Sequence, residues 1–108
     1  MARACPTLRK QKHHIYGEVN SPSDIRAINC HIREQIRRAR RKDRITELVR
    51  RSLYLYTLTF SPAWRKKFAG KIRQLRKVAK EEYSKTARAA NRRLKQLGFA
   101  ARFDEKLG

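Results

Sequence analysis

The sequence predicts an all-α protein, built as a long antiparallel helical hairpin or a small helical bundle with a basic N-terminal arm. Three observations predict this fold. Apolar residues recur every three or four positions through most of residues 22–97, which is the period of an amphipathic helix. A Ser-Pro pair opens each half of this region, at Ser21-Pro22 and Ser61-Pro62. The two halves are nearly equal in length, and their short connection favours antiparallel neighbours.

Three segments are expected along the chain of 108 residues, which is long enough for one small domain. Residues 1–20 form an irregular basic arm, because Pro6, Gly17 and Asn20 interrupt any helix. Residues 21–98 form the helical domain, and residues 99–108 form a C-terminal tail. At the start of the domain a serine can cap a helix and a proline suits the first helical position.

The first helix is expected over residues 22–59, with a break allowed. Its apolar stripe continues toward Phe60 and consists of Ile25, Ile28, Ile32, Ile36, Ala39, Ile45, Leu48, Val49, Ser52, Leu53 and Tyr56. Residues 52–60 are also rich in β-forming side chains. A strand over residues 53–60 would suit a dimeric ribbon-helix-helix protein, but the helical pattern that follows is too long for that fold, so helix is favoured.

The second helix is expected over residues 62–97, again with a break allowed. Its apolar positions are Trp64, Phe68, Ile72, Leu75, Val78, Ala79, Tyr83, Ala87, Ala90, Leu94 and Leu97. Gly70 weakens this pattern, Ser84 could split it in two, and Gly98 suits its C-terminal end. Beyond it, Phe99 and Phe103 could fold back onto the apolar seam.

The chain carries a net charge of +20, from 29 Lys and Arg against 9 Asp and Glu. So much unbalanced charge repels itself, and a polyanion would relieve the repulsion. Nucleic acid is the commonest such partner, because each neutralised phosphate releases a counterion. Arginine supplies 18 of these cations. Its planar guanidinium can donate two parallel hydrogen bonds to a phosphate.

Two basic clusters, within residues 37–51 and 65–80, are expected to meet at the closed end of the hairpin as one positive surface. The candidate nucleic-acid-binding residues are Arg26, Arg33, Arg37, Arg38, Arg40, Arg41, Lys42, Arg44, Arg50, Arg51, Arg65, Lys66, Lys67, Lys71, Arg73, Arg76, Lys77 and Lys80. Tyr54 and Tyr56 cannot both face the seam of a helix, so one could stack on a base. Phe60, Trp64 and Phe68 are expected in the core.

These features favour a small nucleic-acid-binding protein that acts as a structural or accessory component. It would bind RNA, as in ribosome-type ribonucleoproteins, or DNA, with RNA slightly favoured. No homeodomain, RRM or KH signature is present. The alternative is an adaptor or inhibitor that binds an acidic protein surface, or the channel of a nucleic-acid-handling enzyme, through its apolar helix face. Nucleic-acid binding would weaken steeply with salt, whereas a protein interface with an apolar centre would lose less.

Catalysis, a cofactor and a metal site are not expected. The carboxylates lie among basic residues and suit ion pairs such as Glu34 with Arg38 and Glu47 with Arg51. The metal candidates are Cys5, His13, His14, Cys30 and His31. Their spacing fits no standard zinc arrangement, so a small buried Cys30 and surface histidines are favoured.

The expected location is the cytoplasm or another reducing compartment, with an organelle allowed and secretion not expected. Two cysteines do not make a disulfide framework. The longest apolar run, residues 53–60, is too short to span a bilayer, and residues 1–19 contain no apolar stretch of a secretory signal. A helix lying on a membrane surface is also disfavoured, because the isoleucine stripe is narrow.

Overall fold

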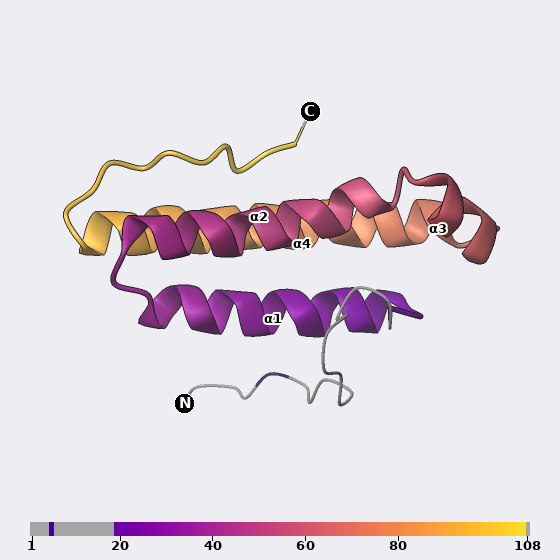
Figure 1. Ribbon diagram of the computed structural model, residues 1–108, viewed down its shortest axis with the longest axis horizontal. Helices are drawn as coiled ribbons and strands as arrows, with labels where there is room; N and C mark the ends of the chain where they lie inside the picture. Colours follow the sequence, from indigo (N-terminus) through magenta and orange to yellow (C-terminus); the bar gives the residue numbers. More distant parts are fainter. Residues whose placement is uncertain (1–4, 6–18, 108) are drawn as a thin grey trace.

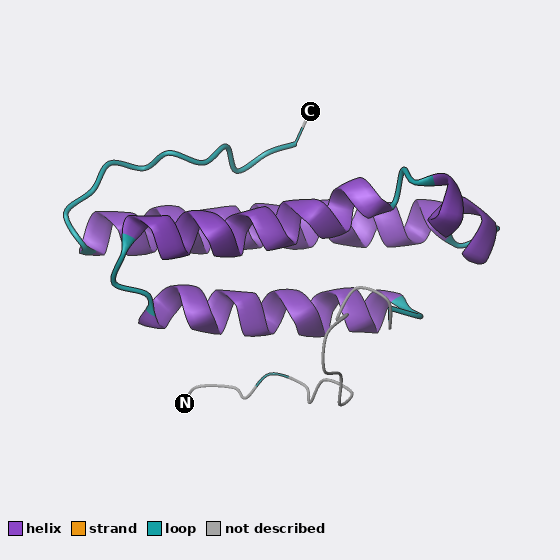
Figure 2. Ribbon diagram, viewed as in Figure 1, coloured by secondary structure: helices purple, strands orange, loops and turns teal. Residues whose placement is uncertain are grey.

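The chain folds into four helices in a computed structural model that describes Cys5 and residues 19–107. The helices are α1 (Pro22–Arg38), α2 (Lys42–Leu58), α3 (Pro62–Lys67) and α4 (Ile72–Gln96). Figure 2 shows no strand in the part of the chain that is described. The prediction of an all-α protein with a small helical bundle is therefore confirmed. The strand of the ribbon-helix-helix alternative does not form, because residues 53–58 continue α2.

The three long helices lie side by side, and α3 lies at one end of them (Figure 1). Helix α2 runs antiparallel to α1 and α4, which run in the same direction. The molecule measures 44 × 32 × 26 Å along its principal axes. A hairpin of two long helices is thus replaced by a three-helix bundle with a short fourth helix.

The first predicted helix breaks at residues 39–41, where Ala39 and Arg41 adopt extended backbone conformations. The apolar stripe has a gap here, since Ala39 is followed by no apolar residue before Ile45. Reversing the chain at the gap lets both halves of the stripe pack against α4. A continuous helix would carry one of those halves away from α4.

The second predicted helix breaks at Gly70 and not at Ser84. Gly70 has φ = 88°, a left-handed conformation that glycine adopts without steric cost, and the Lys71 N–H donates to the Phe68 carbonyl (2.8 Å). Ser84 lies within α4, where its hydroxyl donates to the carbonyl of Lys80 (3.3 Å). A serine that bonds back to the preceding turn is tolerated within a helix.

The helix ends follow the predicted signals in part. The Trp64 N–H donates to Ser61 Oγ (3.2 Å), so Ser61 caps α3. At the start of α1 the Ser21 side chain makes no such capping hydrogen bond, and Asp24 Oδ2 accepts from the N–H of Asn20, just before the helix (2.8 Å). Gly98, with φ = 89°, ends α4 in a Schellman motif. In this motif the Phe99 N–H reaches the Leu94 carbonyl (2.8 Å) and the Gly98 N–H reaches the Lys95 carbonyl (3.0 Å).

The core is formed mainly by the predicted apolar stripes of α1, α2 and α4, but Leu55 takes the place expected for Leu53 and Tyr56, which are only partly buried, and Val19 is added from outside the stripes. Its fully buried aliphatic side chains are Val19, Ile25, Ile36, Ile45, Leu48, Leu55, Leu75 and Leu94. Trp64 and Phe68 are also buried, as predicted. Phe60 is not a core residue, because 45% of it is exposed. It follows the end of α2, and the chain turns there toward α3.

A cluster of buried polar side chains links the three long helices near the middle of the bundle. Asn29 in α1 is fully buried, and its Oδ1 accepts hydrogen bonds from Ser52 Oγ of α2 and from Thr86 Oγ1 of α4 (3.0 Å). Its Nδ2 donates to the Ile25 carbonyl (3.0 Å). Because the polar atoms are paired with one another, burying them is tolerated, and the pairing specifies how the helices align.

The C-terminal tail folds back along the bundle, as predicted for Phe103, which packs partly buried against the core. Asn91 of α4 holds it. The Asn91 Oδ1 accepts from the N–H groups of Arg102 (3.1 Å) and Phe103 (3.0 Å), and its Nδ2 donates to the Phe103 carbonyl (2.8 Å). Phe99 remains 40% exposed, so only one of the two phenylalanines reaches the seam.

Candidate nucleic-acid interface

The two basic clusters lie at opposite ends of the bundle. The turn-end cluster is the part of the first predicted cluster that lies around the α1–α2 turn (Arg37, Arg38, Arg40, Arg41, Lys42 and Arg44), whereas Arg50 and Arg51 lie farther along α2. The α3-end cluster (Arg65, Lys66, Lys67, Lys71, Arg73, Lys77 and Lys80) lies on α3, the turn after it and the first turns of α4 (Figure 1). The Arg93 Nε donates to the Ala39 carbonyl (2.8 Å), so the turn lies beside the last turns of α4. The predicted single surface is therefore wrong, because the chain reverses at residues 39–41.

The α3-end cluster is a positive surface without carboxylates. All of its side chains belong to exposed residues, and residues 48–80 contain no Asp or Glu. Among the residues that the structure describes, no ion pair involves a member of this cluster. Arg73, Lys77 and Lys80 follow one another at helical spacing along one face of α4. This arrangement can hold a row of anionic groups.

Phe60 lies beside this cluster and is half-exposed. The guanidinium of Arg76 stacks on its ring at 4.0 Å from the centroid and donates to the Thr59 carbonyl (2.9 Å). Tyr56 packs edge-on against the same ring (5.2 Å between centroids). Arg76 was a predicted binding residue, but these contacts make it a support for Phe60. The exposed part of the ring can stack on a base.

The turn-end cluster is partly neutralised. Arg38 pairs with Glu34 (3.9 Å), and Arg44 and Arg51 both pair with Glu47. The predicted Glu34–Arg38 and Glu47–Arg51 pairs are thus confirmed. Arg37, Arg40 and Arg41 are exposed and form no ion pair with the described residues.

The remaining predicted residues differ in their surroundings. Arg26 and Arg50 are exposed, on α1 and α2. Arg33 points into the bundle, where its Nη1 pairs with Glu82 (3.1 Å) and donates to Thr86 Oγ1 (3.4 Å). Its side chain is only 17% exposed, so Arg33 joins helices and offers no free guanidinium to a ligand.

The predicted binding residues end at Lys80 and leave out the cations of the second half of α4. These are Lys85, Arg88, Arg92, Arg93 and Lys95. Arg92 and Arg93, with Arg37 of α1, line a hollow of about 190 Å³ at the turn end of the bundle. The repeat of Arg88, Arg92 and Lys95 at helical spacing was the signal that could have found this half of α4.

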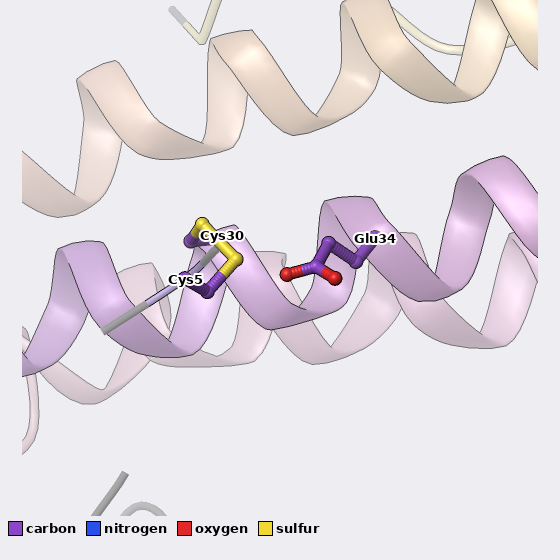
Figure 3. A group of neighbouring side chains, drawn as sticks. All are labelled: Cys5, Cys30 and Glu34. Atoms are coloured by element: carbon purple, nitrogen blue, oxygen red, sulfur yellow. A yellow bond between two sulfur atoms is a disulfide. The ribbon is translucent and has the colours of Figure 1, made fainter. Parts of the chain in front are cut away.

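Cys5 and Cys30 form a disulfide, with their Cα atoms 5.7 Å apart. Figure 3 shows the Glu34 side chain beside it, and its carboxylate lies within 4.8 Å of both sulfur atoms. Cys30 is half-buried rather than buried. The disulfide gives no support to the expected reducing compartment. Bonded sulfurs are not the thiolates that bind metals, and His13 and His14 lie outside the described residues.

No helix in the described part of the chain is long and apolar enough to cross a membrane. No protein family matches the chain, and no curated protein or solved structure is significantly similar to it. A functional interpretation therefore depends on the residues and their geometry.

Proposed function

We propose that this protein binds nucleic acid through the α3-end cluster. The observation that carries the proposal is the row of exposed cations around α3 together with the absence of any Asp or Glu from residues 48–80. Basic residues on a folded surface are usually interspersed with acidic ones. Phosphates of a nucleic-acid backbone would neutralise these side chains and release counterions, which favours binding.

The geometry suits an extended backbone ligand. Arg73 and Lys80 are seven residues apart on α4, which corresponds to about 10 Å along a helix. Successive nucleotides of one strand rise by about 3.4 Å, so the row can meet several phosphates. The half-exposed Phe60 ring beside it suits the unstacked bases of single-stranded or looped RNA. These two features support RNA over duplex DNA as the ligand.

The proposal is tested by measuring affinity for single-stranded RNA, duplex RNA and duplex DNA across a series of salt concentrations. The triple variant R73Q/K77Q/K80Q removes three cations from the row. Its affinity should fall, and its log–log salt slope should flatten by about 0.7 per lost contact on a single strand and about 0.9 on B-form DNA. Circular dichroism should be unchanged, because glutamine is a good helix former.

The matched control is K95Q/R102Q/K106Q, which removes the same charge from exposed residues outside the α3-end cluster. Equal losses of affinity in the two variants would contradict the proposal, since net charge alone would then explain binding. Binding to none of the nucleic acids, with salt-resistant binding to an acidic protein, would favour the adaptor or inhibitor alternative.

A further inference from the structure

The hollow at the turn end of the bundle is lined by arginines from two helices. Ala89, Arg92, Arg93 and Gln96 contribute from α4, and Arg37 contributes from the last turn of α1. The four α4 residues are spaced by three, one and three positions, so they share one face of that helix. The small side chain of Ala89 leaves the space between the longer ones. No carboxylate lines the hollow.

One of the three guanidiniums is held in place by the fold. The Arg93 Nε donates to the Ala39 carbonyl (2.8 Å), and its Nη1 donates to Gln96 Oε1 (3.2 Å). Arg93 is therefore positioned before any ligand arrives. Preorganised donors lose less conformational entropy when they bind.

The other two guanidiniums have no comparable role in the fold. Arg37 and Arg92 are exposed, and neither makes a hydrogen bond or ion pair with the described residues. Cations are favoured in the last turn of a helix, which accounts for Arg37 in α1 and Arg93 in α4 but not for Arg92 beside them. Three like charges without a counter-charge repel one another, and an anion bound between them would offset this repulsion.

We propose that this hollow binds a single phosphate group. Its volume of about 190 Å³ is more than ten times the roughly 10–15 Å³ that a cavity needs to hold one water molecule, so a phosphate can enter with some of its hydration. Planar guanidiniums donate pairs of parallel hydrogen bonds to phosphate oxygens, and the Gln96 amide can add another donor. The phosphate can belong to a nucleic acid or to a free phosphate anion. This site is separate from the α3-end cluster and does not depend on the function proposed for it.

Titration with inorganic phosphate, followed by calorimetry and by the arginine Nε–H signals in NMR spectra, tests the site. The wild-type protein should bind one phosphate saturably and shift the Arg93 signal. In the double variant R37Q/R92Q the affinity should fall at least tenfold. The control R102Q/K106Q removes the same charge from the C-terminal tail, outside the hollow, and should bind as the wild type does.

A second variant keeps every charge. Ala89→Leu should fill the hollow, and leucine preserves the helix because its propensity is close to that of alanine. Phosphate binding should be lost in A89L while circular dichroism and thermal melting stay unchanged. Unsaturable binding to the wild type, or equal binding to R37Q/R92Q, A89L and the control, would overturn the proposal.

Competition with a short oligonucleotide, with and without a 5′-phosphate, identifies the source of the phosphate. Displacement of inorganic phosphate by either oligonucleotide assigns the hollow to nucleic acid, and a lack of displacement assigns it to a free anion. Failure of the α3-end variants to alter RNA affinity would leave this result unaffected, so the two proposals fail independently.

Discussion

Arg33 of α1 and Glu82 of α4 form an ion pair, with 3.1 Å between Nη1 and Oε1, although they are 49 residues apart in the sequence. The Glu82 side chain is only 4% exposed. Lys85 pairs with the second oxygen of the same carboxylate (3.2 Å) from the helix surface. Arg33 also donates to Thr86, which links the ion pair to the polar group around Asn29. The two helices are thereby held in one register.

Replacing Arg33 by Met should lower the free energy of unfolding by about 3 kcal/mol, because it leaves a buried carboxylate with a single exposed partner. Lys85→Met is the matched control. Its side chain is 57% exposed, so its loss should cost less than about 1 kcal/mol. Urea unfolding followed by circular dichroism measures both. An equal cost for the two variants would show that Arg33–Glu82 does not act as a buried pair.

Replacing Asn29 by Leu should destabilise the protein by about 2 kcal/mol or more. The hydroxyls of Ser52 and Thr86 would lose their shared acceptor, and a buried unsatisfied polar group costs about 1–3 kcal/mol. The triple variant N29L/S52A/T86V removes all three polar partners and should recover much of this loss. Thermal unfolding compares the variants. If the triple variant were less stable than the single one, the hydroxyls would not be the source of the cost.

Acid should release the C-terminal tail. The hydrogen bond from Asn91 to Glu105 (3.0 Å) lowers the pKa of this carboxyl, and Arg88 lowers it further. A lowered pKa in the folded state stabilises the docked tail above the ordinary pKa of a glutamate, and this stabilisation is lost as the pH falls through the lowered value. The protection of the Arg102 and Phe103 amides, measured as their hydrogen exchange relative to the intrinsic rate at each pH, should therefore fall in acid.

Glu105→Gln and Asn91→Ala separate the contributions to tail docking. E105Q removes the titrating group, so the protection of the tail amides should no longer fall in acid through this carboxyl. N91A removes the acceptor of both amide hydrogen bonds, so the tail should exchange rapidly even at neutral pH. A tail that stayed protected in N91A would mean that Phe103 packing alone holds it.

Reduction of the disulfide should destabilise the protein. Cys5 and Cys30 close a loop with a sequence separation of 25, and loop-closure entropy attributes about 3 kcal/mol to a link of this length. The melting temperature of the wild type should fall in reductant, whereas that of C5S/C30S should not change. Alkylation followed by mass spectrometry should label the cysteines only after reduction. Labelling of both without reductant would contradict the pairing.

The local features of the fold were predictable because they depend on neighbours in the sequence. The helical period placed Ile25, Ile36 and Leu94 in the core, and Gly98 marked the end of α4. The surface pairs around Glu34 and Glu47 follow from spacings of three and four residues. The turn at residues 39–41 was not predicted, since a helical period cannot show which packing buries both halves of an apolar stripe.

The candidate sites likewise combine features that the sequence predicts with features that only the folded structure shows. The charge excess and the acid-free segment of residues 48–80 can be read directly from the sequence. The partners of Arg33, Arg76 and Arg93 cannot, because each contacts a group that another helix or turn supplies. The hollow at Ala89 likewise exists only where α1 ends beside α4.

The sequence by itself determined the helical class, the start of α3, the end of α4 and the net charge of +20, because these follow from local spacing and composition. Only the tertiary structure decided where the charges gather, and it placed the two clusters at opposite ends. It also joined Cys5 to Cys30 and turned three arginines toward one hollow. The physical reason is that burial of the apolar stripes sets the path of the chain, and that path then determines which polar side chains meet.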